Sequence, residues 1–133
     1  MAIILDADVL IGEERGTFNL RGWLSTQIEE EFELAAITVA ELLHGLERAT
    51  GAHRKKRREY IDGALSSFRV VPYTARTAEF HARVWADLES RGKMIGYHDL
   101  IVAATALERG NPVATFNSRH FSAVKGLKVI QPR

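Results

Sequence analysis

The sequence contains no cysteine. This absence excludes a disulfide framework, a thiolate metal site and a nucleophilic thiol. The histidines do not have the spacing of a zinc site, and no His-x-x-x-His pair is present. Any metal ion held by this chain must therefore sit on oxygen or histidine, and the lack of histidine pairs favours oxygen.

The sequence also lacks a large excess of charge and a long apolar run. Lys and Arg exceed Asp and Glu by only one, 18 against 17, which argues against a protein that coats nucleic acid through bulk positive charge. The first apolar run reaches a charge at Asp6 after only four residues, so it is neither a signal peptide nor a membrane span. We expect a cytoplasmic protein with no membrane segment.

The chain has 133 residues, of which 46% are hydrophobic. That length and composition predict one domain over residues 1–133, with one proper core and no room for a second domain of ordinary size.

Short apolar runs alternate with stretches of helical periodicity along the chain. The runs predict strands at Ala2–Leu5, Leu34–Ile37, Arg69–Pro72, Pro112–Thr115 and Leu127–Ile130. The periodicity predicts helices at Leu20–Phe32, from Thr38 onward, at about His53–Ser67, at Ala75–Arg91 and at Asp99–Leu107, and a short turn at Ser118–Phe121. This alternation is typical of an α/β fold with a mostly parallel sheet.

Four polar residues are expected at one edge of this sheet. Asp6 directly follows the first strand, Glu41 lies in the first turn of the helix after the second strand, and Asn117 follows the fourth. Functional groups of parallel sheets gather just beyond the carboxyl ends of the strands. Asp99 starts a helix that runs antiparallel to the next strand, so it should reach the same edge.

Three carboxylates gathered in this way repel one another and are costly to desolvate. A divalent cation removes the conflict, and oxygen ligands favour Mg²⁺ or Mn²⁺ over Zn²⁺. Such an ion activates water and stabilises charge on a phosphate. We therefore predict a phosphodiesterase site at Asp6, Glu41 and Asp99, with Asn117 as a further ligand, direct or through water.

Some of these residues also have structural explanations. Glu41 completes a capping box if Thr38 is the N-cap of its helix, and Asp99 suits a helix N-cap. Asn117 suits the turn after a strand. Asp6 has no expected capping or packing role at the end of a buried strand.

Four segments carry a resemblance to a known family. Ile4–Leu10 (ILDADVL), Ala36–Leu42 (AITVAEL), Ile95–Ala106 (IGYHDLIVAATA) and Val113–Asn117 (VATFN) resemble, in the same order, the successive motifs of PIN-domain proteins. Within that family the chain is most similar to the VapC-type toxins of bacterial toxin–antitoxin pairs, from the first strand to Gly126–Ile130.

The resemblance implies a three-layer α/β/α fold with four to five short strands, and an endoribonuclease with Mg²⁺ or Mn²⁺ at Asp6, Glu41 and Asp99. It also implies a cognate VapB-like antitoxin, a homodimer, and structured RNA such as tRNA or ribosomal RNA as target. Asn117 and His120 stand where relatives carry an acid, and Asp8 stands where Asn or Ser is commoner.

Residues around the acids are candidates for contact with substrate. Asp8 and His98 flank the expected metal ligands, while Arg48 and Arg119 carry charges suited to phosphate. The basic run of residues 53–58 is either a solvated helix face or a guide for RNA.

Two other functions remain open from the sequence. A phosphatase of the haloacid dehalogenase type also begins with an Asp-x-Asp motif, here Asp6 and Asp8, but it needs a later lysine and a paired acidic motif. A PIN-like module that binds RNA or a partner without cutting it is the other alternative. A phosphorylated receiver domain is disfavoured, because residues 72–74 after the third strand contain no aspartate.

Overall fold

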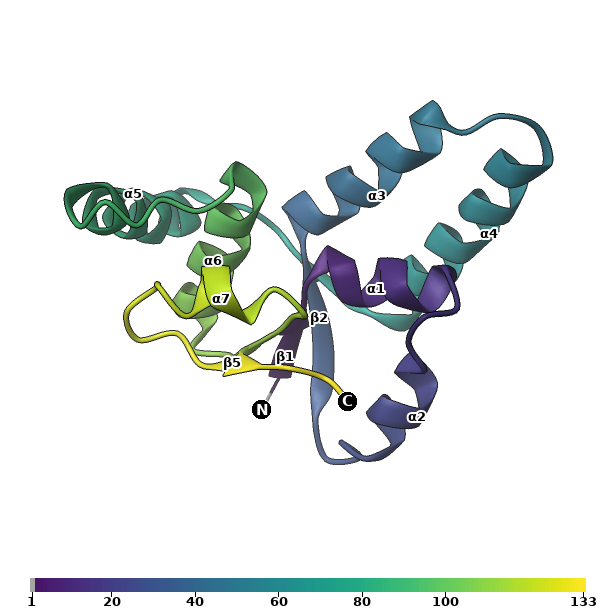
Figure 1. Ribbon diagram of the computed structural model, residues 1–133, viewed down its shortest axis with the longest axis horizontal. Coiled ribbons are helices and arrows are strands. Elements are labelled where there is room, and N and C mark those ends of the chain that lie inside the picture. Colours follow the sequence, from purple (N-terminus) through teal and green to yellow (C-terminus); the bar gives the residue numbers. More distant parts are fainter. Residues whose placement is uncertain (1) are drawn as a thin grey trace.

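The computed structural model describes residues 2–133, which form a five-stranded sheet surrounded by helices (Figure 1). The strands are β1 (Ala2–Leu5), β2 (Glu31–Ala35), β3 (Arg69–Val71), β4 (Val113–Ala114) and β5 (Val129–Ile130). Their order is β3-β2-β1-β4-β5, and every neighbouring pair is parallel. The predicted mostly parallel sheet is confirmed, and all four strand pairs among the described residues are parallel.

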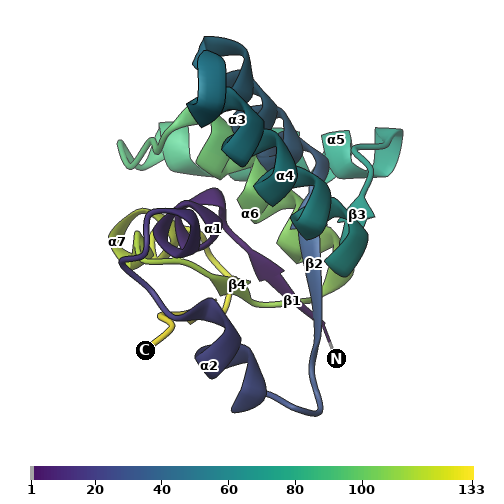
Figure 2. The same cartoon turned by 90° about the vertical axis from the view of Figure 1, so that its right-hand side faces the viewer.

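Helices cover both faces of the sheet. They are α1 (Ala7–Glu14), α2 (Leu20–Ser25), α3 (Ala36–Arg48), α4 (Gly51–Ser67), α5 (Ala75–Ser90), α6 (Tyr97–Arg109) and α7 (Ser118–Phe121). Figure 1 shows α1–α4 on one side of β1 and β2 and α5–α7 on the other, and Figure 2 shows α3 and α4 side by side. The three layers predicted for the fold are therefore present.

The alternation of side chains in β1 explains why there are two cores. Ile3 and Leu5 point into the core shared with α1–α4, and Ile4 points into the core shared with α5–α7. All three side chains are at most 3% exposed. Because both faces of β1 are covered, its sequence is apolar throughout, as in central strands of parallel sheets.

The region between α1 and α3 differs from the sequence prediction. The expected helix at Leu20–Phe32 ends at Ser25, and β2 begins at Glu31. Phe32 lies opposite Ile3 in the β1–β2 ladder, so pairing with the central strand outweighs local helical periodicity here. The helix α1 was not predicted, because residues 7–14 carry no clear apolar stripe.

An acid in the middle of the sheet has a structural partner. Glu33 in β2 is 2% exposed, and its carboxylate accepts hydrogen bonds from Arg109 Nε at 2.8 Å and Nη2 at 2.6 Å. Asn111 Nδ2 donates to the same group at 3.3 Å. Two charge-assisted bonds in this geometry satisfy a buried carboxylate, so Glu33 belongs to the scaffold.

The helix α6 spans Tyr97–Arg109 and so extends two residues beyond the predicted Asp99–Leu107 at each end. Gly110 follows its last residue with φ +67°, in the left-handed region that favours glycine at a helix end. Within residues 2–133, no helix is both long and apolar enough to span a membrane.

Candidate active site

Asp6 occupies the junction between β1 and α1. Its backbone N–H donates to the carbonyl of Ala114 in β4, while its side chain is the N-cap of α1 and accepts a 2.8 Å bond from the N–H of Ala7. The expectation that Asp6 has no capping role was wrong, because the unpredicted helix α1 begins directly after it. Capping and a role at the sheet edge are compatible, since the second carboxylate oxygen faces β4.

That second oxygen is held by a residue that sequence reasoning missed. Thr115 donates its hydroxyl to Asp6 Oδ2 at 2.8 Å and lies 3.2 Å from Asp8 Oδ2. Thr115 directly follows β4 and is fully buried. A hydroxyl residue at the carboxyl end of a central strand, two positions before Asn117, was the available signal.

Burial makes the charge of Asp6 costly. The side chain is 4% exposed, and its pKa is raised from 3.8 to about 7, first by desolvation and then by repulsion from Asp8 and Asp99. The Thr115 and Ala7 bonds act in the opposite direction. Several carboxylates thus lie within electrostatic range of one another.

Asp8 lies in the first turn of α1 and faces the same region. Its Oδ2 accepts a 3.1 Å bond from the N–H of Phe116, and its Oδ1 is buried without a partner among the described residues. Burial and then repulsion from Asp99 raise its pKa. Asp8 therefore adds both negative charge and an unsatisfied oxygen to the site.

Glu41 reaches the site from α3. The capping box expected for it is absent, because α3 begins at Ala36 with Ala35 as N-cap, and Thr38 lies buried in the first turn. The Glu41 side chain is 26% exposed, and its Oε1 has no hydrogen-bond partner among the described residues. Desolvation raises its pKa; His98, whose Nδ1 lies 3.9 Å from Oε1, lowers it, and Asp99 raises it.

Asp99 is positioned by α6 and meets α7. The N-cap of α6 is Gly96, so the expected N-cap role of Asp99 is wrong and the residue lies in the first helical turn. Its Oδ2 is 3.1 Å from His120 Nδ1 and 3.5 Å from Asn117 Nδ2. Asn117 and His120 are themselves 2.8 Å apart. Asn117 thus directs its side-chain amide toward Asp99.

These acids are suited to a hard divalent cation by their chemistry. Asp6, Asp8, Glu41 and Asp99 supply only oxygen donors, and two of these oxygens are buried and unpartnered. Within residues 2–133, no three His, Asp or Glu side chains stand close enough together to enclose an ion. The donor set fits Mg²⁺ or Mn²⁺, and binding requires these side chains to draw closer.

The other candidate residues are spread around the acids. His98 lies beside Glu41, and Arg119 is exposed on α7 next to His120. Arg48 is the last residue of α3, about two helical turns, or roughly 10 Å, beyond Glu41. The structure therefore brings Asp8, His98 and Arg119 to the site and leaves Arg48 at a distance.

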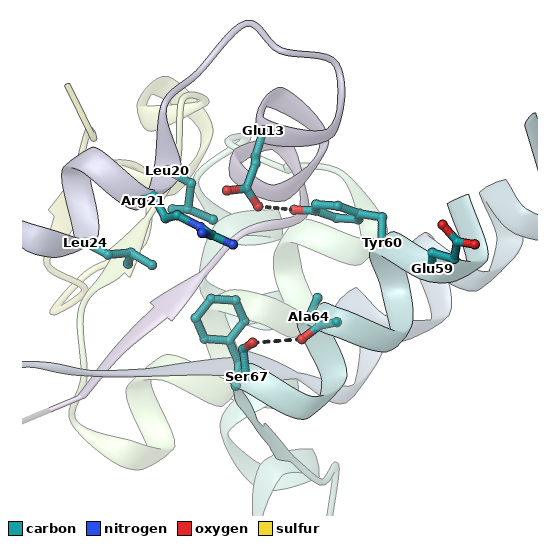
Figure 3. Close-up of a pocket in the computed structure, with 10 residues that line it drawn as sticks. Glu13, Leu20, Arg21, Leu24, Glu59, Tyr60, Ala64 and Ser67 are labelled. Carbon is teal, nitrogen blue, oxygen red and sulfur yellow. Dashed lines mark hydrogen bonds between the residues drawn. The ribbon is translucent and has the colours of Figure 1, made fainter. Parts of the chain in front are cut away.

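Two hollows differ in their relation to the acids. One, of about 590 Å³, has Lys93, Met94, Arg119 and His120 in its lining, and it borders Asp99 through His120. The other, of about 450 Å³, lies between α2 and α4, where the Tyr60 hydroxyl is 2.8 Å from Glu13 Oε1 (Figure 3). None of the four acids lines this second hollow.

Comparison with known proteins gives consistent matches over almost the whole chain. The PIN domain family model matches residues 3–127. The VapC ribonuclease Y4jK of Sinorhizobium fredii is 34% identical, with 98% of this chain and 96% of that protein covered. Toxin FitB of Neisseria gonorrhoeae is 32% identical, with 91% of each covered. The crystal structure of FitAcB from Neisseria gonorrhoeae superposes with a TM-score of 0.84 at 31% identity, covering 97% of this chain and 96% of that one.

Proposed function

This chain belongs to the PIN domain family, and we propose that it is an endoribonuclease that serves as the toxin of a toxin–antitoxin pair. The relatives named as a VapC ribonuclease and as a toxin support this assignment. We further propose that its activity depends on Mg²⁺ or Mn²⁺ held by Asp6, Glu41 and Asp99.

The carboxylates that meet at one sheet edge are the observation that carries the proposal. Burial and mutual repulsion raise the pKa values of Asp6, Asp8 and Glu41. Such crowding destabilises a fold unless protons or a bound cation neutralise the charges. The unpartnered oxygens of Asp8 and Glu41 support the proposal that a cation completes the site.

The protein's own residues orient the acids. Thr115 and the N–H of Ala7 fix the two oxygens of Asp6, and Asn117 and His120 hold one oxygen of Asp99. A divalent ion supplies Lewis acidity toward water and toward the phosphate. These hydrogen bonds restrain Asp6 and Asp99 before RNA binds, whereas Glu41, whose Oε1 has no partner among the described residues, is free to move toward them.

The phosphatase alternative has little support. Asp6 would have to act as a nucleophile, yet it is 4% exposed and both of its oxygens are hydrogen-bonded. The match to the PIN domain family also spans residues 3–127 rather than the short Asp-x-Asp motif alone.

The partner proposed for this chain is a cognate antitoxin of the VapB type. Co-expression with such a partner is expected to suppress RNA cleavage and to give a stable complex on purification. A homodimer remains a prediction, which light scattering on the purified chain would test.

The activity is tested by RNA cleavage with Mg²⁺, with Mn²⁺ and with EDTA. Asp6→Asn and Asp99→Asn are each expected to reduce cleavage on the order of a hundredfold or more, because loss of even an outer partner of a metal ligand costs up to that amount. Asp62→Asn is the matched control, since Asp62 is exposed and, among residues 2–133, forms an ion pair only with Arg58, at 3.4 Å. Full activity of both site variants would refute the assignment. Tight RNA binding without metal-stimulated cleavage would instead identify a non-cleaving module.

A further inference from the structure

A positively charged groove lies beside the acidic site. We call it the basic groove and define it by Arg91, Lys93, Met94, Arg119, His120 and Lys125, which line its volume of about 590 Å³. One wall is the segment after α5, and the other is α7 with the residues that follow it. Arg91 Nη2 donates to the carbonyl of Ala123 at 2.7 Å and so ties the two walls together.

Charge is concentrated in this groove, although the chain as a whole carries a formal net charge of only +1. Its described lining includes no Asp or Glu. Asp87 lies behind it and pairs with Arg91 at 2.6 Å and with Lys125 at 3.6 Å. In the described part of the chain, Lys93 and Arg119 have no carboxylate within ion-pair distance. Two exposed cations are therefore left to meet an outside anion.

The groove is continuous with the acidic site through His120. This side chain lines the groove, and its Nδ1 lies 3.1 Å from Asp99 Oδ2. A polyanion seated on Lys93 and Arg119 would therefore run toward the carboxylates. Lysine and arginine are suited to phosphate oxygens, arginine through its planar guanidinium.

The other basic segment of the chain is less suited to this role. In the run of residues 53–58, Arg57 pairs with Glu14 at 3.2 Å and Arg58 with Asp62 at 3.4 Å. Arg54 donates to the carbonyl of Leu46. The run lies in the first two turns of α4, and Figure 1 places the start of α4 at the end of the α3–α4 pair that is far from α7. Half of this run thus serves contacts within the protein.

We propose that the basic groove binds the sugar–phosphate backbone of the RNA and guides it to the acids, with Lys93 and Arg119 as the principal contacts. This inference rests on the proposed ribonuclease function and adds the path by which its substrate reaches the site.

The test compares two double variants that each remove two positive charges. Lys93→Ala/Arg119→Ala lies in the basic groove, and Lys55→Ala/Lys56→Ala lies on α4 as the matched control. Binding of a single-stranded oligouridylate is measured by fluorescence anisotropy in EDTA at several salt concentrations. Each lost phosphate contact lowers the slope of log affinity against log salt by roughly 0.7. The slope of the groove variant should therefore be smaller by about 1.4. Between 50 and 200 mM salt, the RNA affinity of wild type should fall about sevenfold more than the affinity of this variant.

The same variants are assayed for cleavage in Mg²⁺. The groove variant should show a raised KM with kcat nearly unchanged, because its residues bind RNA away from the reacting phosphate. Unchanged salt slopes, or equal losses in both double variants, would overturn the proposal. Loss of binding to an acidic protein partner with RNA binding intact would also overturn it. If wild type cuts no RNA with either metal, the proposed function fails, while the binding experiment still decides on the groove.

Discussion

The hydroxyl of Thr115 lies 2.8 Å from Asp6 Oδ2, across 109 residues of sequence. The hydroxyl oxygen of Thr115 also lies 3.2 Å from Asp8 Oδ2 and accepts a 2.9 Å hydrogen bond from the N–H of Asn117. Thr115 therefore connects β1, α1 and the loop after β4 at one buried point. We assign it a positioning role for the two aspartates.

Replacement of Thr115 by valine is expected to reduce RNA cleavage by roughly tenfold or more, because a hydrogen bond to a charged group contributes about 1.5–3 kcal/mol. Valine keeps the shape of the side chain and removes only the hydroxyl. Thr115→Ser should restore most of the activity. An equally impaired serine variant would show that the methyl group, and not the hydroxyl, is what matters at this position.

The stability of the metal-free protein should depend on pH through Asp6. Its pKa is about 7 in the folded protein against an ordinary 3.8, so the folded state holds the proton over a range where the unfolded chain has lost it. The contribution of Asp6 to the free energy of unfolding is fully present below pH 4 and is lost as pH rises to about 7. The loss amounts to at most about 4 kcal/mol. Urea unfolding in EDTA at pH 5 and pH 8 measures this loss.

Asp6→Asn is the comparison for that experiment, because it cannot ionise. It should lose less stability than wild type between pH 5 and pH 8, and Mg²⁺ at pH 8 should stabilise wild type more than the variant. The same change with pH in both proteins would contradict the burial of this charge.

The ion pair between Glu33 and Arg109 should be a strong structural contact. Arg109→Ala leaves the carboxylate of Glu33, which is 2% exposed, without its charged partner, and should cost roughly 3 kcal/mol or more of unfolding free energy. Adding Glu33→Gln should recover part of that loss, since no buried charge then remains. Arg58→Ala breaks an exposed pair and should change stability by less than about 1 kcal/mol.

A single substitution, glycine to alanine, should have opposite effects at two sites. Gly110 has φ +67°, so Gly110→Ala introduces backbone strain and should destabilise the protein by about 1 kcal/mol. Gly63 lies inside α4, and a Cβ there would meet no atom within 4 Å. Gly63→Ala should stabilise by roughly 0.5–1 kcal/mol. Thermal unfolding of the two variants measures the direction of each stability change. A change in the same direction in both variants would contradict the different backbone conformations assigned to Gly110 and Gly63.

Much of the fold could be predicted because its signals are local. The apolar run Ala2–Leu5 marks β1, and the nearly all-apolar face of residues 100–106 marks the buried helix α6. Parallel strands then send Asp6, Glu41 and Asp99 toward one edge. The boundary between α2 and β2 was misplaced because Phe32 pairs with β1, a contact that local periodicity does not report.

The order of residues along the chain sets which acids follow which strands, and thus the chemical character of the site. Packing in three dimensions sets the other relationships: Thr115 holds Asp6, Arg109 neutralises Glu33, and Lys93 and Arg119 share a groove beside Asp99. These contacts join residues far apart in the chain, and they depend on how the sheet and helices pack. Side-chain periodicity specifies a face of an element, but the partner met on that face is set by packing.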